Sequence, residues 1–534
     1  MKRTFTNVML CVGLLFAVSA NAQNPYLPLW EHIPDGEPHV FDDPDNPGHQ
    51  RVYIYGSHDT RRTDYCGLDQ VVWSAPVEDP TQWRYDGVIF ESKTDANGKL
   101  LNADGKGDIL FAPDVTVKTD KNGKKTYYLY PNNQAEGRQT MVAKADRPDG
   151  PFVACNWDKS DPTKTDGILR FDPGVLTDDD GRTYGYWGFM QSWAGELDPT
   201  TMATLKKGGQ RIENFIPSLK QDETFRFFEA SSIRKIEDKY VFIYSRWTRE
   251  GEFGLPGTNY TLAYAYSDYP LGPYTYGGTL IDARGRDHDP QGNIIPTANP
   301  TGNTHGSLCE VNGKWYVFYH RQTGINEYSR QAMVAPVEVK VEKGLGGKVT
   351  ISEGEVTSEG FLTSGLDPRQ RYSAGIACWL TGPESTYRNE TGSVFSGSYV
   401  KATYPSSLPT GDLYDLRVNG NPVVNNTDGS IVGFKYFNMS QLRKGRNVTM
   451  VLNLRPTGVG GKVDIMVDSP WEKCGGKRLG SLTLKGGKAG KARDYRVKLT
   501  GADQLQGKHA LFLVFSSPVH GKSLCDFLQI QVQK

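Results

Sequence analysis

The chain of 534 residues has no excess charge of either sign and, beyond its amino terminus, no apolar run long enough to cross a bilayer. Lys and Arg total 61, and Asp and Glu also total 61, so no net field favours nucleic acid or an anionic membrane. Stretches with the 3.6-residue period of helices are scarce, whereas Tyr, Gly and Trp are plentiful. We therefore expect a mostly β protein of two or three domains, without a membrane span, whose partner is neutral, as a sugar polymer would be.

Cysteine is sparse, and it forms no CxxC pair and no metal-ligand spacing. A chain of this size does not need disulfides to fold, so most of its cysteines are expected to be packed thiols. Cys474 and Cys525 are the one pair to test as a disulfide. The sequence also lacks a Gly-rich phosphate loop opening a helix and a cluster of His, Cys and carboxylates, which disfavours a nucleotide- or metal-dependent enzyme.

Residues 1–22 have the features of a secretory signal peptide. Lys2 and Arg3 give a basic start, an apolar run follows from Val8 to Ala20, and Ala20-Asn21-Ala22 provides a small-x-small cleavage site. We expect cleavage before Gln23 and export to the periplasm or the medium. No Cys stands at the predicted mature terminus, so a lipid anchor is not indicated.

One phrase recurs five times between residues 23 and 341: a short apolar strand, a turn, and a Tyr-rich strand. The copies are RVYIYGS, DVTVKTDKNGKKTYYLY, GVLTDDDGRTYGYWG, SIRKIEDKYVFIYS and SLCEVNGKWYVFYH. Each copy is a small antiparallel sheet that cannot bury its faces alone. A series of such copies is typical of a β-propeller, here with five blades.

The remainder of the chain predicts a second all-β unit. Residues 342–366 form a connecting segment rich in Gly, and residues 367–534 contain seven or more short strands with closely spaced turns. This spacing predicts a jelly-roll-like β-sandwich. Trp471 and Tyr495 are its evident candidates for stacking on a sugar ring. The residues leave open whether the sandwich binds sugar or only braces the propeller.

A propeller brings the entrances of its innermost strands to one central funnel, so carboxylates at these entrances converge. Such groups are costly to bury unless they have a task. The candidates are Asp35 and Glu37 in IPDGEPHVF, Asp114 in FAPDV, and Glu229 in RFFEASSI.

Together these motifs resemble glycoside hydrolase family 43, a family of five-bladed propellers that hydrolyse arabinose-, xylose- and galactose-containing glycans with inversion. The matching pieces, in chain order, are Asn24-Pro25, Glu37-Pro38, Ala112-Pro113-Asp114-Val115, Phe171-Asp172-Pro173, Glu229-Ala230-Ser231, His305-Gly306 and Arg330. Part of the sandwich, from Gly461 to Val532, resembles a family 6 carbohydrate-binding module.

The resemblance implies Glu229 as the general acid. Phe227 and Phe228 precede it, and an apolar setting raises the pKa of a carboxyl. Asp114 is then expected to orient Glu229 and to hold its pKa high by repulsion.

The identity of the base stays open between two carboxylates. The family motif has Asp directly before Pro, whereas Glu37 precedes Pro38 here and Asp35 lies two residues upstream. Gly36 between them could let the backbone turn either side chain inward. We favour Asp35, because a longer side chain at a catalytic position would require the strand to move.

Substrate contacts are expected from Asp172, Trp187, His305 and Arg330. In many relatives the His that matches His305 lies near a hydrated calcium on the propeller axis. The resemblance therefore allows Ca²⁺ beside His305, with no cofactor required.

The sequence thus predicts an exported inverting hydrolase of arabinose- and xylose-containing polysaccharides or oligosaccharides, of the α-L-arabinofuranosidase or β-xylosidase type. An endo-arabinanase or β-galactofuranosidase of the same fold is the alternative within the family. A non-catalytic glycan-binding protein is the alternative from another class.

Overall fold

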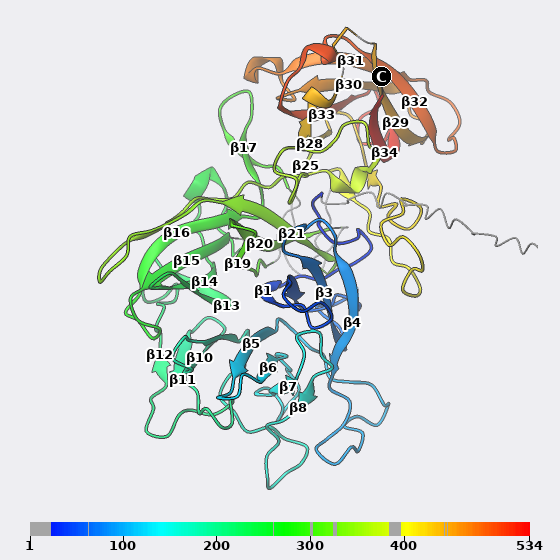
Figure 1. The fold of residues 1–534 in the computed structure, drawn as a ribbon. Helices are drawn as coiled ribbons and strands as arrows, with labels where there is room; N and C mark the ends of the chain where they lie inside the picture. The colour runs from blue at the N-terminus through cyan, green and yellow to red at the C-terminus, as the bar shows by residue number, and fades with distance from the viewer. Residues whose placement is uncertain are drawn as a thin grey trace, which may run out of the picture.

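The computed structural model describes residues 23–533 except 62, 260, 299–302, 324–327, 384–396, 443 and 446. The expected signal peptide lies outside the described residues. The described chain forms two all-β units, a propeller that occupies the lower part of Figure 1 and a sandwich above it. Its helical elements are 3₁₀ turns of three residues each: η1 (Glu252–Gly254), η2 (Ala374–Ile376), η3 (Met439–Gln441), η4 (Glu472–Cys474) and η5 (Ala502–Gln504). Within the described residues, no helix is long and apolar enough to cross a membrane.

The first four blades are antiparallel sheets of four strands each. They comprise β1 (Glu37–Asp42), β2 (Gln50–Tyr55), β3 (Asp69–Pro76) and β4 (Arg84–Glu91); β5 (Asp114–Thr119), β6 (Lys125–Tyr130), β7 (Ala143–Ala145) and β8 (Val153–Ala154); β9 (Gly174–Thr177), β10 (Thr183–Trp187), β11 (Trp193–Glu196) and β12 (Ile212–Glu213); and β13 (Phe227–Ile236), β14 (Lys239–Arg246), β15 (Thr261–Ser267) and β16 (Thr275–Asp282).

The fifth blade has three strands, β19 (Ser307–Val311), β20 (Lys314–Gln322) and β21 (Arg330–Val337). The hairpin β17 (Arg286–His288) and β18 (Ile294–Pro296) precedes it, and the pair β22 (Val339–Val341) and β23 (Val349–Ile351) follows it. Together these strands give the five-bladed propeller that the repeats predict.

Tight hairpins inside the blades depend on short polar side chains and on glycine. Between β5 and β6, the Asp120 carboxylate accepts hydrogen bonds from the backbone N–H groups of Asn122 and Lys124, at 2.8 and 2.9 Å. Gly123 completes the turn with φ of 82°, a backbone conformation that glycine adopts without strain. The turn residues seen in the repeats therefore form the hairpins expected of them.

The innermost strands β1, β5, β9, β13 and β19 form a closed ring, since each contacts the next and β19 contacts β1. Their first residues consequently meet around one axis. The amino-terminal residues fasten the ring: the Asn24 side chain donates to Val334 O at 2.6 Å, and its Oδ1 accepts from Val334 N at 3.0 Å. This segment lies along the outer strand of the last blade and closes the circle.

The carboxy-terminal sandwich has two sheets. One has the order β26 (Tyr399–Val400), β27 (Val423–Val424), β34 (Cys525–Gln533), β29 (Val448–Pro456) and β32 (Arg493–Leu499), with β24 (Tyr372–Ser373) also pairing with β34. The other has the order β25 (Trp379–Thr381), β28 (Ile431–Asn438), β33 (Lys508–Ser516), β30 (Gly461–Val467) and β31 (Lys477–Leu484). The strands β31 and β32 are therefore edge strands, and one connection joins them.

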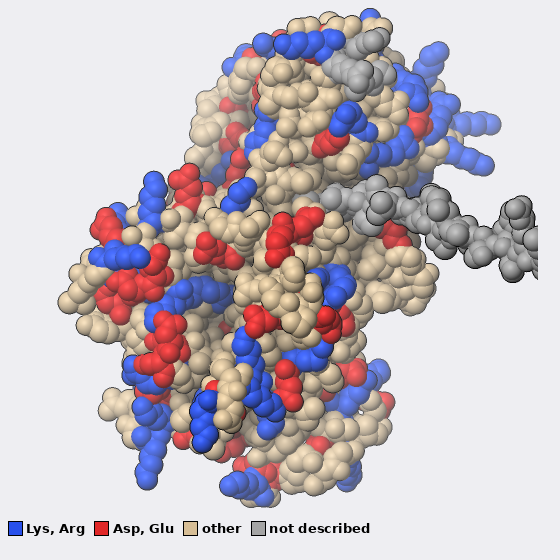
Figure 2. Space-filling model, in the orientation of Figure 1, with Lys and Arg blue, Asp and Glu red and all other residues tan. Residues whose placement is uncertain are grey.

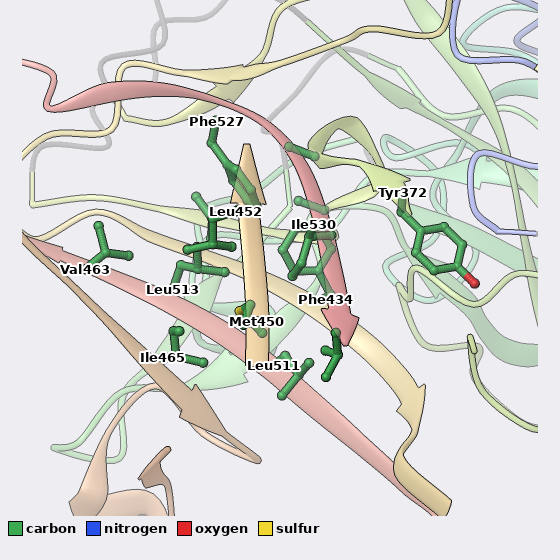
Figure 3. Close-up of a cluster of buried hydrophobic side chains, with 14 of the residues drawn as sticks. Tyr372, Phe434, Met450, Leu452, Val463, Ile465, Leu511, Leu513, Phe527 and Ile530 are labelled. Atoms are coloured by element: carbon green, nitrogen blue, oxygen red, sulfur yellow. The ribbon is translucent and has the colours of Figure 1, made fainter. Parts of the chain in front are cut away.

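Alternate residues of these strands point between the two sheets and form the largest apolar cluster of the molecule. Figure 3 shows Met450 and Leu452 of β29 facing Leu511 and Leu513 of β33, with Phe527 among them. The period-2 pattern that predicts the strands also selects these inward-facing residues.

The two units share a junction of direct hydrogen bonds. The Trp30 indole donates to Leu413 O at 2.9 Å, and the Asn421 side chain donates to Leu29 O at 2.8 Å.

The described cysteines are free thiols, including Cys474, which is exposed, and Cys525, which is buried. The Cys474–Cys525 disulfide is therefore absent.

Candidate active site

A pocket of about 360 Å³ opens where the blade entrances meet. Most of its polar groups come from segments that lead into an innermost strand. Its lining comprises Asp35, Tyr65, Cys66, Phe111, Ala112, Phe171, Asp172, Phe189, Phe228, Glu229, Trp247, Asn259, Asn303, His305 and Arg330. The propeller thus gathers three carboxylates, an imidazole and a guanidinium from distant parts of the chain.

Asp35 is a buried carboxylate held by one guanidinium and one hydroxyl. Arg330 donates from Nη1 to Asp35 Oδ1 at 2.9 Å, and the Ser57 hydroxyl donates to Oδ2. Burial alone would raise the pKa of Asp35, but the charge of Arg330 lowers it below its ordinary value. Asp35 is therefore ionised at neutral pH.

The backbone at Asp35 aims this side chain into the pocket. Asp35 has φ of 58°, in the left-handed region that Asp tolerates better than most residues. At Gly36, a Cβ would lie 2.8 Å from Ile54 Cδ1, so the close turn favours glycine here. Two residues later the chain enters β1, and Glu37 no longer borders the pocket.

Glu229 shows the opposite electrostatic behaviour. Burial raises its pKa to about 8, and the negative charge of Asp172 adds to the shift. Asp172 accepts a hydrogen bond from the Asn132 side chain at 2.8 Å and one from the Ala230 backbone N–H at 3.1 Å. The second bond fixes Asp172 beside the residue that follows Glu229. Glu229 consequently carries a proton at neutral pH.

His305 lies between the carboxylates. Its Nδ1 is 3.7 Å from Asp172 Oδ2, and its Nε2 is 3.7 Å from Glu37 Oε1. Burial lowers the pKa of His305, but Glu37 and Asp172 outweigh it and raise the pKa to about 9. The next residue must be glycine, because a Cβ at Gly306 would lie 1.9 Å from Phe318 O. Gly306 therefore lets the chain pass close to β20, the strand paired with β19, with the His305 imidazolium just before it.

Arg330 is almost fully buried and forms a fork between two carboxylates. Its Nε and Nη2 donate to Asp59 at 2.9 and 2.8 Å, while Nη1 reaches Asp35. The Tyr65 ring lies 4.8 Å from the guanidinium carbon. Bidentate pairing of this kind fixes a guanidinium in orientation as well as in charge. Arg330 is thus a positioning residue for Asp35.

Glu37 and Asp114 form a second cluster on the propeller axis, away from the pocket lining. Arg234 donates to Glu37 at 2.7 Å, and His39 Nε2 lies 2.8 Å from Asp114 Oδ1. The other Asp114 oxygen accepts from Val175 N at 2.6 Å. Asp114 therefore ties two neighbouring blades together. The expectation that it raises the pKa of Glu229 is wrong in this structure, because Asp172 is the carboxylate placed beside Glu229.

The axial cluster is also the one group in the described residues that could hold a metal ion. Ligand atoms of Glu37, His39 and Asp114 lie within 4.8 Å of one another. Ca²⁺ takes six to eight oxygen ligands, whereas Glu37 already neutralises Arg234 and Asp114 already accepts backbone hydrogen bonds. The positive charge of Arg234 and His305 further disfavours a cation. These residues fit a cluster of ion pairs better than a calcium site.

Trp187 does not contact the pocket, contrary to the expectation of a substrate contact. Its side chain is buried in a cluster with Tyr130 and Leu169. The aromatic wall of the pocket is instead formed by Phe171, Phe189, Phe228 and Trp247.

This wall is a continuous series of rings. The Phe189 ring centroid lies 5.1 Å from those of Phe171 and Phe228, and Trp247 lies 5.2 Å from Phe228. Phe171 and Phe228 directly precede Asp172 and Glu229 in sequence. Their position next to these two carboxylates could therefore have identified Phe171 and Phe228 as wall residues from the sequence. No comparable sequence signal marks Phe189 or Trp247.

Comparison with known proteins assigns the propeller to a family. The sequence profile of Glycosyl hydrolases family 43 matches residues 49–343. The chain belongs to this family. It is 35% identical over 439 residues to a xylosidase/arabinosidase of Thermoclostridium stercorarium. This alignment covers 79% of this chain and 84% of the relative.

Two further matches extend beyond the propeller. An arabinoxylan arabinofuranohydrolase of Paenibacillus polymyxa is 27% identical over 533 residues, covering 93% of this chain and 73% of the relative. The crystal structure of the family 43 arabinoxylan arabinofuranohydrolase of Bacillus subtilis, in complex with cellotetraose, matches with a TM-score of 0.45 and 22% identity. The match covers 97% of this chain and 98% of that chain.

A third match is shorter. The structure of a β-xylosidase/α-arabinofuranosidase from a compost metagenome, solved with xylotriose in a calcium-free form, has a TM-score of 0.41 and 22% identity, covering 61% of this chain and 96% of that chain.

Proposed function

We propose that this glycoside hydrolase removes terminal arabinofuranosyl or xylosyl units from arabinoxylan-type polysaccharides or their oligosaccharides. One observation carries the proposal: a single pocket holds two carboxyl groups whose pKa values are displaced in opposite directions, Asp35 downward and Glu229 upward. A pair displaced in this way supplies a base and an acid at the same pH. Binding a glycan without cleaving it would not require such an acid–base pair.

The proposed reaction is a single displacement with inversion at the anomeric carbon. Glu229 donates its proton to the glycosidic oxygen as the bond to the anomeric carbon breaks. Asp35 accepts a proton from a water molecule on the opposite face of the sugar, and the water oxygen forms the new bond. The products are the free sugar and the alcohol of the remaining glycan. Solvent then removes the proton from Asp35 and returns one to Glu229.

The neighbouring charges support these roles. Asp172 keeps Glu229 protonated by repulsion, and Arg330 keeps Asp35 ionised by attraction. His305 provides a positive charge between Asp172 and Glu37. Asp172 and Arg330 thus keep Glu229 protonated and Asp35 ionised, the two states that the reaction needs at its start.

Pocket size favours action on terminal units. A volume of about 360 Å³ lies at the small end of the range for ligand pockets, which extends to about 1,000 Å³. Such a pocket suits one sugar ring with part of the next. Names of the relatives support pentose substrates, since they describe xylosidases, arabinosidases and arabinoxylan arabinofuranohydrolases.

We also propose that the enzyme acts outside the cytoplasm, in the periplasm or the medium. The basic start, the apolar run and the cleavage site within residues 1–22 support this location.

The test is a substrate screen followed by product analysis. Nitrophenyl α-L-arabinofuranoside, β-D-xylopyranoside and β-D-galactofuranoside are compared with arabinoxylan, arabinan and xylan. We expect release of single pentoses, and proton NMR of the first product is expected to show the inverted anomer. Release of longer oligosaccharides would contradict action on terminal units. Binding without cleavage of any substrate would contradict the enzymatic function.

A further inference from the structure

The sandwich has a local excess of positive charge that the neutral composition of the whole chain conceals. Residues 461–500 contain ten Lys and Arg but only four Asp and Glu. Figure 2 shows Lys and Arg side chains gathered on the outer side of the sandwich, where Figure 1 places β32. The sequence-based expectation of a neutral partner therefore does not extend to this surface.

Four of these cations surround a hollow of about 560 Å³. Its charged lining is Lys485, Lys488, Lys491 and Arg493, and no carboxylate borders it. All four residues are exposed, and none forms an ion pair with a carboxylate of the described chain. Like charges around one concavity repel each other, and a bound anion would relieve that repulsion.

The nearest acidic residue in the sequence is engaged elsewhere. Asp494 pairs with Arg371 at 2.5 Å and accepts from the Asn453 side chain at 2.7 Å. It follows Arg493 directly but does not border the hollow. The positive charge of the hollow is therefore not compensated by its neighbour in the chain.

Backbone hydrogen bonds fix the segment that carries the lysines. This segment joins β31 to β32, and it is held against the turn between β29 and β30. Gly487 N donates to Gly458 O at 2.9 Å, and Gly490 N donates to Pro456 O at 3.0 Å. Lys488 stands between the two anchored glycines, and Lys485 and Lys491 flank them. The cations are thus presented from a fixed backbone, which lowers the entropy lost on binding.

Protection of sheet edges does not account for these lysines. Exposed edge strands are often protected by Lys, and β31 and β32 are edge strands. Lys485, Lys488 and Lys491, however, lie in the connection between the strands, where no strand edge has to be covered.

The aromatic candidates of the sandwich do not favour a neutral sugar. The Arg493 guanidinium lies 4.9 Å from the Tyr495 ring centroid and donates to the Tyr495 hydroxyl at 2.9 Å. Trp471 packs edge-on against Trp379, with centroids 5.8 Å apart. Stacking on an uncharged pyranose needs an open ring face, whereas Arg493 covers Tyr495.

We propose that this hollow binds the uronic acid carboxylates of an acidic polysaccharide through Lys485, Lys488, Lys491 and Arg493. The choice of a polysaccharide among polyanions rests on the proposed function, because xylans carry uronic acid substituents. A concave site of this volume suits one or two sugar units. Duplex nucleic acid would instead require a longer basic stripe.

The test compares two forms of one polymer and two charge-matched variants of the full chain. The ligands are glucuronoxylan and the same polymer after chemical reduction of its carboxyl groups to alcohols. The test variant is Lys485→Gln/Lys488→Gln/Lys491→Gln. The control is Lys121→Gln/Lys207→Gln/Lys220→Gln, which removes the same charge from exposed lysines of the propeller that form no ion pair within the described chain.

We expect the unchanged protein to bind glucuronoxylan in affinity electrophoresis at low salt and to bind the reduced polymer at least about tenfold more weakly. The test variant should lose about tenfold in affinity for glucuronoxylan, and the control variant should lose less than about twofold. Both variants should hydrolyse nitrophenyl pentosides as the unchanged protein does, because the hollow is not part of the catalytic pocket.

Three results would overturn the inference: equal binding of both polymers, equal loss in both variants, or tighter binding of duplex DNA or phosphatidylglycerol vesicles than of glucuronoxylan. The nitrophenyl assay separates the two proposals. Uronate binding without hydrolysis would overturn the proposed function alone, and hydrolysis without uronate binding would overturn this inference alone.

Discussion

The two units of the protein treat charge in opposite ways. The propeller buries carboxylates, an imidazolium and guanidinium groups around its axis. The sandwich instead has an apolar core, and of its described charged side chains only Lys435 is buried. Burial of charge is costly unless partners satisfy it. The propeller satisfies it with ion pairs from different blades, so its centre displaces pKa values and can perform chemistry. The sandwich core stabilises the fold by apolar burial.

The largest expected effect comes from removing the acid of the propeller. Glu229→Gln should lower kcat on substrates with poor leaving groups by about 10²–10⁴-fold, because the leaving oxygen is no longer protonated. The loss should be much smaller on nitrophenyl glycosides, whose leaving group needs little protonation. Steady-state kinetics on both substrate classes measure the difference. An equal loss in both would show that Glu229 is not the general acid.

The second prediction separates the two carboxylates of IPDGEPHVF. Asp35→Asn should abolish hydrolysis, and added azide should restore turnover of an activated substrate by replacing the water that lacks its base. Glu37→Gln leaves Arg234 buried without its partner charge, so it should lower the free energy of unfolding by about 3–5 kcal/mol, with no effect of azide.

Azide-rescued turnover and thermal unfolding of both variants give the answer. Rescue in Glu37→Gln alone would assign the base to Glu37 and would contradict the position of Asp35 in the pocket.

A core substitution in the sandwich should affect stability but not chemistry. Leu513 is fully buried between the sheets, and Leu513→Ala should lower the free energy of unfolding by about 2–5 kcal/mol. The kcat on a nitrophenyl pentoside, measured well below the unfolding temperature, should stay unchanged. Val519→Ala, at an exposed position of the same unit, serves as the control. A lower kcat in folded Leu513→Ala would show that the sandwich core supports the catalytic pocket.

The dependence of kcat on pH distinguishes the effect of Asp172, beside Glu229, from that of Asp114, on the propeller axis. The raised pKa of Glu229, about 8, sets the alkaline limit, since the acid loses its proton above it. Asp172→Asn removes a negative neighbour and should lower this pKa, so activity should fall at a lower pH. Asp114→Asn should leave the alkaline limit unchanged. Profiles of kcat against pH test both variants, and a shift in Asp114→Asn alone would reverse the assignment.

The smallest expected effect is that of metal removal. Arg234 and protonated His305 already neutralise the axial carboxylates, so dialysis against EDTA should leave kcat within about twofold of its starting value. Activity is then measured again after addition of Ca²⁺. A large loss that Ca²⁺ restores would show that an ion occupies the axis in spite of these cations.

The sequence alone determined the local features of the protein. Repeated strand-turn-strand phrases predict the blades, because alternation and Asx-Gly turns are local properties of the chain. The same repeats predicted that carboxylates at the blade entrances meet in one funnel, which holds for Asp35 and Glu229 but not for Glu37 and Asp114. Asp172 was a candidate only through the family resemblance. The resemblance carried by APDV, FDP and the His-Gly motif already indicates the family in the sequence.

Only the tertiary structure decided which of these charged groups face one another. Asp35 and Glu37 are two residues apart, yet a left-handed turn sends one into the pocket and the strand takes the other to the axis. Arg330 lowers the pKa of Asp35 from a position 295 residues away. Asp172, and not Asp114, is the neighbour of Glu229, because the innermost strand of the third blade contacts that of the fourth. Asp114 begins the innermost strand of the second blade. Ring closure of the propeller brings these groups together, and no local pattern in the sequence records such contacts.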